Sequence, residues 1–404
     1  MGRWTNIQFS SRLSTNKPVL LIFAYAPDQG TLAVFFHWKR LCHSVSQGKK
    51  TKLLRMQNFS ERLKSARIMK GYSLQDLTDA LNNAVSKQAL NKYEQGLMKP
   101  ESDVLIKICN ALDVRPDYFT RENSINLENV EFRKLKKLSA KESARIKEKT
   151  VDILERYFEL EDILGIDEQF VNPIIDLEIN TYQDVEKAVD RLKELWKLGE
   201  DPLPNVIELL EDHNIKVVEI EAGDEFVGLA TWEGIKNPVI VVNSSLKADR
   251  KRFTVLHELG HILMKVNHHE EKDREFLCHS FAGAMLIPRA SLIKELGPSR
   301  SQIYLNELVY LKEQFGVSIQ AIMFRAKHLG IISESFHKNF MIYLSMKGYK
   351  KNEPGEYKGY EKSNRFKQLL FRAVAEEIIS TSKAAALDNK KLSEFREDLD
   401  FYEK

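Results

Sequence analysis

Cysteine is scarce in this sequence, with three residues in 404. Cys42, Cys109 and Cys278 lie far apart, so they show neither the paired pattern of a disulfide framework nor the short spacing of a cysteine zinc site. The sequence therefore argues against both a disulfide framework and a cysteine zinc site. We expect a reducing, cytoplasmic setting and folded domains that depend on apolar cores.

Long apolar runs are also missing. The nearest approach is "KPVLLIFAYAPDQGTLAVFFHW", residues 17–38, which Pro27, Asp28 and Gly30 help to divide into two pieces. Each piece is shorter than the roughly 20 residues that a membrane-spanning helix needs. The sequence predicts no membrane contact.

A strong overall charge is absent, because the formal net charge is only +3. Residues 1–55 hold nine basic side chains against the single acid Asp28, a net of 9 − 1 = +8, so the rest of the chain sums to 3 − 8 = −5. The isoelectric point is therefore no argument for nucleic-acid binding. Residues 1–55 lack helical or strand periodicity, and Met56 precedes a well-patterned helix. We expect a poorly ordered leader or an over-extended start of translation.

The length of 404 residues exceeds what one ordinary core can organise, so about two to four domains are expected. Near the N-terminus, apolar residues recur at helical spacing from Phe59 until Gly71. Ser73 and Ser86 stand where N-caps of two short helices are expected, and a further helix follows Pro100. Four or five short helices with tight turns predict a small bundle.

The stretch "GYSLQDLTDALNNAVSKQALNKYEQGLMKPESDVLIKICNALDV" resembles the helix-turn-helix domains of phage-repressor type, the XRE family. The residues that fall in the family's order are Leu77, Val85, Tyr93, Glu94, Gly96 and Pro100. By this resemblance the helix over residues 87–95 would lie in the major groove of operator DNA. The candidate contacts to bases or phosphates are Lys87, Gln88, Asn91 and Lys92.

Two departures from that family bear on the affinity for DNA. Leu74 stands where many relatives carry a phosphate-contacting glutamine, and the turn around Asn83 and Ala84 has two extra residues. Residues 56–120 also hold nine basic and eight acidic side chains, so little non-specific attraction to DNA is available. A helical bundle used for protein contacts is the alternative. A homodimer on a two-fold operator would compensate for weak single sites.

Residues 128–200 are rich in charge and predict mostly helix. The run "SAKESARIKEKTVDILERYFELEDIL" keeps apolar residues such as Ile146, Leu154 and Ile163 close to one stripe, while its alternating charges are typical of a solvated face. We expect a spacer that holds two functional ends apart and that dimerises.

The sequence then predicts an α+β region. The runs "IKVVEIE", "FVGLATWE" and "NPVIVVN" are short, rich in β-branched residues and separated by turn residues, so they predict a small sheet. The next segment, "RFTVLHELGHILMK", predicts a helix with His257 and His261 four residues apart. Both imidazoles would lie on one face, about 6 Å apart along the helix axis.

Two imidazoles at this separation can share one tetrahedral zinc ion, and Glu258 would then act as the general base. A bound zinc ion would lower the pKa of water toward neutrality, so that a carboxylate suffices to take the proton during attack on a peptide carbonyl. The alternative is two core histidines that donate to backbone carbonyls. We disfavour it because burying two histidines and a glutamate without a metal leaves costly unsatisfied groups.

A catalytic zinc site needs a third protein ligand, and the spacing alone leaves it open. A compact metzincin site is excluded, because position 267 is Asn and not His. His268 and His269 fall in a polar run that is typical of a loop. The following helix offers Glu275, with His279 one turn later on the same face.

The segments "RFTVLHELGHILM" and "EFLCHSFAGAMLIP" together resemble the ImmA/IrrE family of zinc metallopeptidases, whose hallmarks are RFTxAHExGH and ExxAxxFAxxLLxP. By this resemblance His257 and His261 are zinc ligands, Glu258 is the catalytic base and Glu275 is the third ligand. His279 replaces a common asparagine of the family, which leaves it open as an accessory or competing ligand.

Beyond Pro288 the run "NELVYLKEQFGVSIQAIMFRAKHLGIIS" predicts another helix, turn and helix. In the resembled family such a unit packs beside the protease and shapes its cleft, and a second DNA-reading motif is the alternative. The final 65 or so residues predict helices and a basic surface without a site.

The predicted fold is mainly α with a small α+β domain. The expected organisation is a leader or over-extended start (1–55), an XRE-type helix-turn-helix domain (56–121), a helical spacer (122–200), an ImmA/IrrE-like zinc metallopeptidase domain (201–337) and a helical extension (338–404).

Three functions fit this organisation. The first is a zinc endopeptidase that binds operator DNA and cuts a cytoplasmic partner, such as a repressor or an antitoxin-like protein. The second is a transcriptional regulator that uses the metallopeptidase fold as a sensor without hydrolysis. The third, an amide hydrolase acting on small molecules, is disfavoured by the fused DNA-binding module. Intact Glu258 and Glu275 favour the first, because a degenerate sensor could lose either residue.

Overall fold

The computed structural model of the chain describes residues 58–121, 125, 127–128, 138–233, 237–266 and 270–400. The expected leader at residues 1–55 lies outside the described residues, as do Cys42, His268 and His269. The described part is mainly helical and contains one small sheet, as the sequence predicts.

The N-terminal bundle consists of a helix over residues 58–70, α2 (Leu74–Ala80), α3 (Lys87–Glu94), α4 (Ser102–Leu112) and the 3-10 helix η1 (Pro116–Thr120). Its core contains one or more leucines or isoleucines from each α-helix, among them Leu63, Leu77, Leu90 and Ile108. The predicted N-caps are confirmed, since Ser73 accepts a hydrogen bond from the Asp76 amide and Ser86 accepts one from the Ala89 amide.

The long turn between α2 and α3 is built by two asparagines. Asn82 and Asn83 have φ values of 52° and 59°, in the left-handed region that asparagine tolerates better than most residues. The two extra residues noted in the sequence are therefore accommodated without glycine, and Val85 after them is buried in the bundle core.

The sheet has the strand order β1-β3-β4-β2. Its strands are β1 (Leu127–Glu128), β2 (Lys216–Ile220), β3 (Gly228–Glu233) and β4 (Asn237–Asn243). β4 pairs parallel with β2 and antiparallel with β3, and β1 pairs antiparallel with β3. The three predicted strands are present, and the two-residue β1 adds an edge that the sequence pattern did not indicate.

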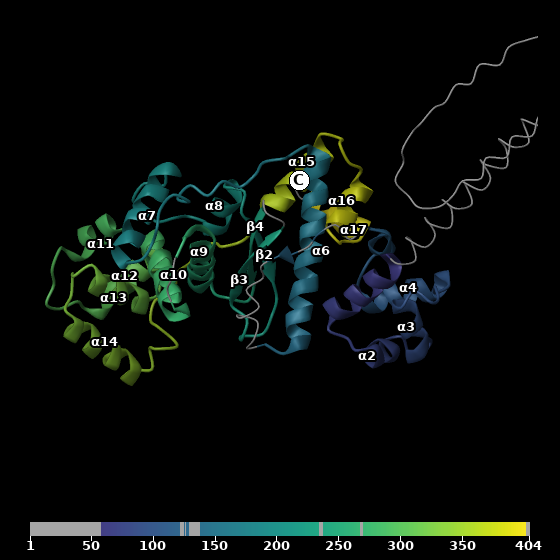
Figure 1. Ribbon diagram of the computed structural model, residues 1–404, viewed down its shortest axis with the longest axis horizontal. Helices are drawn as coiled ribbons and strands as arrows, with labels where there is room; N and C mark the ends of the chain where they lie inside the picture. Colours follow the sequence, from purple (N-terminus) through teal and green to yellow (C-terminus); the bar gives the residue numbers. More distant parts are fainter. Residues whose placement is uncertain are drawn as a thin grey trace, which may run out of the picture. The chain divides into compact units, whose positions relative to one another are not determined.

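Both faces of the sheet are covered, which explains why β4 carries the unbroken apolar run at residues 238–242 (Figure 1). Side chains alternate between the faces, so Val239 and Val241 join a core with α6 (Ala140–Leu164), whereas Ile240 and Val242 join a core with α9 (Ala248–Leu263). The sheet thereby supports α9 on the side that packs against Ile240 and Val242.

Helix α6 buries the apolar stripe that the sequence indicated. Ile146 and Leu154 pack into the core with the sheet, and Tyr157 and Leu160 pack with residues of the C-terminal helices. The apolar stripe found in the sequence is wide enough to need cover along its whole length. α6 is thus a shared wall between the sheet and the C-terminal helices.

The remaining helices are α7 (Tyr182–Leu195), α8 (Val206–Asp212), α10 (Glu271–Leu286), α11 (Arg289–Leu296), α12 (Leu305–Phe315), α13 (Ile319–His328), α14 (Glu334–Met346), α15 (Arg365–Ala375), α16 (Thr381–Leu387) and α17 (Leu392–Asp400). Within the described residues no single helix is long and apolar enough to cross a membrane, although α10 and α11 together reach that length and hydropathy across a 66° bend.

Residues 357–361, from the C-terminal part of the chain, contact α9. Arg252 on α9 is fully buried and donates to the Leu203 carbonyl oxygen and to the Tyr357 hydroxyl. Its Nε lies 3.4 Å from a carboxylate oxygen of Glu361, whose other oxygen accepts from the Val206 amide at the start of α8. Residues 357–361 therefore clamp the beginning of α9, although the sequence indicated no role for this segment.

Candidate functional site

Helix α9 is buried along nearly its whole length, between the sheet and α10. His257 is 6% exposed and Glu258 is 2% exposed. A helix that is buried on all sides carries polar residues at a cost unless each meets a partner. The buried polar residues in the middle of α9 therefore indicate a functional site on this helix.

Four donor atoms from three side chains converge between α9 and α10. The Nε2 atoms of His257 and His261 lie 3.2 Å apart. Glu275 on α10 places one carboxylate oxygen 3.1 Å from His257 Nε2 and the other 3.3 Å from His261 Nε2. Ligands of a tetrahedral zinc ion bound at 2.0–2.1 Å lie about 3.3 Å from one another, so the three side chains fit a zinc ion in donor type and in spacing.

His279 joins the same group from the next turn of α10. Ligand atoms of His257, Glu275 and His279 all lie within 4.8 Å of one another, and the rings of His257 and His279 have centroids 4.3 Å apart. Two alternative triads thus share His257 and Glu275, one completed by His261 and the other by His279. In the triad with His261, the two Nε2 atoms and the nearest carboxylate oxygens lie 3.1 to 3.3 Å apart.

Glu258 lies close to the sheet, at the start of β3. A β-carbon placed on Gly228, the first residue of β3, would lie 3.7 Å from Cγ of Glu258 and 2.8 Å from a methyl carbon of Thr254. The absence of a side chain at Gly228 therefore leaves the room that Glu258 and Thr254 occupy.

The two helices cross closely at Gly260. A β-carbon on this residue would lie 3.4 Å from the Cα of Cys278 and 3.4 Å from a ring carbon of Phe281, both on α10. Glu275 is one turn before Cys278, so this contact places its carboxylate opposite the two histidines. Cys278 itself is buried at the helix crossing.

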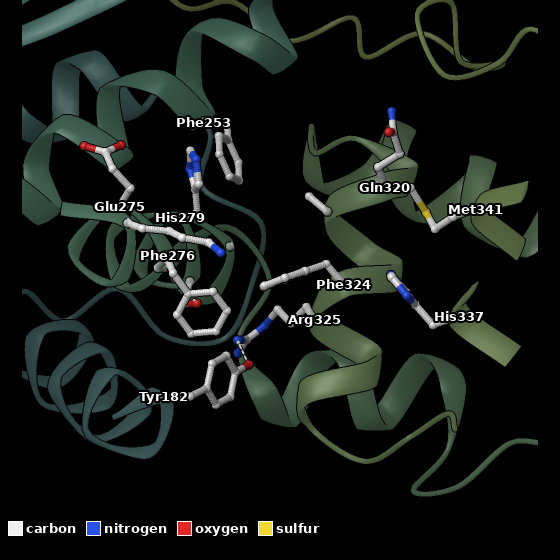
Figure 2. A pocket seen from close by; sticks show the side chains of 14 residues that line it. Tyr182, Phe253, Glu275, Phe276, His279, Gln320, Phe324, Arg325, His337 and Met341 are labelled. Atoms are coloured by element: carbon white, nitrogen blue, oxygen red, sulfur yellow. Dashed lines mark hydrogen bonds between the residues drawn. The ribbon is translucent and has the colours of Figure 1, made fainter. Parts of the chain in front are cut away.

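A cavity of about 770 Å³ opens beside the donor group, and Glu275 and His279 form part of its wall (Figure 2). The opposite wall comes from α13 and α14, where Figure 2 shows Gln320, His337 and Met341. The helix, turn and helix predicted beyond Pro288 is confirmed as α12 and α13, and α13 lines this cavity.

The second set of predicted residues lies on α3 of the N-terminal bundle. Lys87, Gln88, Asn91 and Lys92 are all exposed, whereas Leu90 and Tyr93 on the same helix are buried. Arg67 of the preceding long helix fixes the end of α3, because it donates from Nε and Nη2 to the two carboxylate oxygens of Glu94 at 2.6 and 2.8 Å. The polar face of α3 is therefore presented on a rigid bundle.

Comparison with known families assigns both regions. The model of the IrrE N-terminal-like domain, of the M78 peptidase type, matches residues 210–327, and the helix-turn-helix model matches residues 63–119. The chain carries both domains. The family resemblances seen in the sequence are thereby confirmed. The donor group and Glu258 fall inside the IrrE N-terminal-like domain, and α3 falls inside the helix-turn-helix domain.

Curated relatives are similar over short stretches only, and all come from Bacillus subtilis (strain 168). The SPbeta prophage-derived uncharacterized HTH-type transcriptional regulator YonR is 40% identical over 63 residues, which is 16% of this chain and 56% of YonR. The HTH-type transcriptional regulator ImmR is 29% identical over 72 residues, 18% of this chain and 55% of ImmR. The chain spans little more than half the length of each of these relatives.

The helix crossing yields the first prediction. Gly260→Val should destabilise the IrrE N-terminal-like domain by about 1 to 3 kcal/mol, because the added carbons overpack the contact with Cys278 and Phe281. Gly283→Ala on α10 is the matched control, since its β-carbon would meet only Arg325 Cδ at 4.0 Å. Denaturant unfolding followed by intrinsic tryptophan fluorescence measures both. Equal stability of the two variants would contradict the tight crossing.

Proposed function

We propose that the protein is a DNA-binding regulatory zinc endopeptidase that hydrolyses a peptide bond in a cytoplasmic partner, either a repressor or an antitoxin-like protein. The observation that carries this proposal is the convergence of His257, His261 and Glu275 within 3.1 to 3.3 Å of one another, next to Glu258 on the same helix. The operator-binding part rests on the exposed polar face of α3.

The proposed zinc ligands are His257 Nε2, His261 Nε2 and a carboxylate oxygen of Glu275. A zinc ion held there supplies Lewis-acid chemistry, because it lowers the pKa of water and polarises a peptide carbonyl. Glu258 accepts the proton of the attacking water at its carboxylate and passes that proton to the leaving amine nitrogen. Burial of Glu258 on α9 limits its rotamers and so holds the base in place.

The fused helix-turn-helix domain supports a regulatory protein as substrate. The relatives that match part of this chain are named as transcriptional regulators, and such proteins act on operator DNA through domains like residues 63–119. A protease tied to such a domain is brought to the DNA where repressors are bound. A homodimer would double the DNA contacts, as a two-fold operator requires.

Metal content tests the ligand set. The purified protein should hold about one zinc ion per chain, and His261→Ala or Glu275→Ala should lose it because each removes one of three protein ligands. His279→Ala is the matched control and should keep the metal. Elemental analysis of dialysed protein gives the stoichiometry, and far-UV circular dichroism checks the fold. Full zinc in Glu275→Ala together with loss in His279→Ala would move the third ligand to His279.

The role of Glu258 separates hydrolysis from sensing. Glu258→Gln should keep the zinc ion and operator binding but slow cleavage of the partner at least about 10²-fold, because the amide cannot accept the proton. Glu295→Gln on α11 changes an exposed carboxylate and should leave the rate unaltered. Partner cleavage in cells is followed by immunoblotting. Normal relief of repression by zinc-loaded Glu258→Gln, with the partner uncut in both forms, would support the non-hydrolytic sensor instead.

DNA binding is tested on α3. Gln88→Ala and Asn91→Ala should each weaken specific operator binding by about 1 to 3 kcal/mol, because they remove contacts to base edges. Lys87→Ala should weaken binding to every sequence and flatten its salt dependence. Lys107→Ala, an exposed lysine on α4, is the charge-matched control. Footprinting on the gene's own promoter measures these effects. An unchanged footprint in all α3 variants would make the bundle a protein-contact module.

A further inference from the structure

The cavity beside the donor group is continuous with the proposed active site. Glu275 and His279 belong to both, and Phe253 on α9 stands next to His279 with ring centroids 5.9 Å apart (Figure 2). From Glu275 the cavity follows one face of α10 through Phe276 to Gly283. If the scissile bond of a substrate lies at Glu275, the side chains next to that bond would lie in this cavity.

Most of the surface of the cavity wall is apolar, although Lys272, Gln320 and His337 also line it. Phe276 on α10 meets Phe324 on α13 with ring centroids 5.7 Å apart, in an edge-to-face arrangement. The ring of His328 contacts them, with its centroid 4.1 Å from that of Phe324 and 5.1 Å from that of Tyr182. Met341 on α14 closes the far side. Such walls favour apolar ligands, since aromatic surfaces contribute area and edge-to-face contacts.

Arg325, one of the charged residues that line the cavity, is already neutralised by a carboxylate. Arg325 donates to both carboxylate oxygens of Glu186 and to the Ile287 carbonyl oxygen, and Figure 2 shows its contact with the Tyr182 hydroxyl. Its guanidinium therefore has little capacity left for an anionic ligand. Burial lowers the pKa of both His328 and His337, which keeps these rings neutral at physiological pH.

The cavity has room for more than one side chain. Its volume of about 770 Å³ falls within the roughly 300–1,000 Å³ that is usual for ligand pockets. Small residues create this space, namely Ser280 and Gly283 on α10 and Ala321 on α13. At Gly283 an added β-carbon would meet only Arg325 Cδ, at 4.0 Å, so the floor of the cavity is open.

We infer that this cavity is the specificity pocket of the protease and that it takes a large apolar side chain, aromatic in preference, next to the bond that is cut. This inference rests on the proposed function and adds the substrate class to it. Partner proteins would be cut beside a phenylalanine, tyrosine, leucine or similar residue, in a segment that can extend along α10.

The pocket can be filled from either wall without touching the proposed ligands. Gly283→Leu fills it from α10 and Ala321→Phe fills it from α13, whereas Gly283→Ala leaves most of the volume free. Each zinc-loaded form is incubated with a mixture of defined peptides that carry every amino acid on either side of a central amide. Mass spectrometry reads the cut positions, and zinc analysis with thermal unfolding shows that each variant is folded and loaded.

Wild-type protein should cut beside large apolar residues at least about tenfold faster than beside alanine, a ratio in the range that apolar pockets provide. Gly283→Leu and Ala321→Phe should reduce that ratio to below about threefold while still cutting. A second readout needs no turnover: Glu258→Gln should bind the best peptide at least about tenfold more tightly than its alanine version, and adding Gly283→Leu should abolish the difference.

The possible failures are distinct. Cleavage without any apolar preference, or a preference that survives both filling substitutions, would overturn the pocket assignment and leave the protease intact. Absence of cleavage by every zinc-loaded form would overturn the proposed function and, with it, the assignment of the cavity.

Discussion

The contact between α9 and α10 at Gly260 is the constraint on which the site depends. Histidines on one helix can be spaced by sequence, but a carboxylate from a second helix reaches them only if the two backbones come close. With no side chain at Gly260, the Cα of Cys278 lies within van der Waals distance of where a β-carbon would stand. Glu275, one turn earlier on α10, is then within 3.3 Å of both imidazoles. The next turns of the same face line the cavity.

Buried charges hold the surrounding frame in register. Arg252 fixes the start of α9 to Glu361 and Tyr357, and a buried cation of this kind is stable only when its partners are placed well. The helix-turn-helix domain is joined to the rest by similar contacts. Arg62 pairs with Glu155 of α6 at 2.5 Å, and Arg121 donates to the Ala386 carbonyl oxygen at the end of α16. The helix-turn-helix domain therefore contacts α6 and α16. Helix α6 also packs against the sheet of the other domain.

Local features of this fold were predictable because short-range rules govern them. The serine N-caps at Ser73 and Ser86, the β-branched strands and the pair His257 and His261 all follow from neighbours within four residues. The family resemblance added Glu275, which spacing alone left open among several side chains. Its position next to the histidines agrees with that expectation, while its role as a ligand stays a prediction.

Features set by distant parts of the chain were not predictable from the pattern. The cavity is lined by residues of α7, α9, α10, α13 and α14. The sequence of any one of these helices therefore does not indicate it. The return of residues 357–361 to Arg252 joins positions about 100 residues apart. The sequence indicated an apolar stripe on helix α6 but not what covers it, which is the sheet and α15. In each case the deciding contact is tertiary, and propensity cannot report it.

X-ray absorption at the zinc edge tests the central claim most directly, because it reports the donor atoms around the metal in the intact protein. The account predicts two imidazole nitrogens and a carboxylate oxygen from the protein, at about 2.0 to 2.2 Å. Glu275→Ala should lose most of the metal. A sulfur neighbour near 2.3 Å, the distance expected for a thiolate such as that of Cys278, or three imidazoles without a carboxylate, would contradict it.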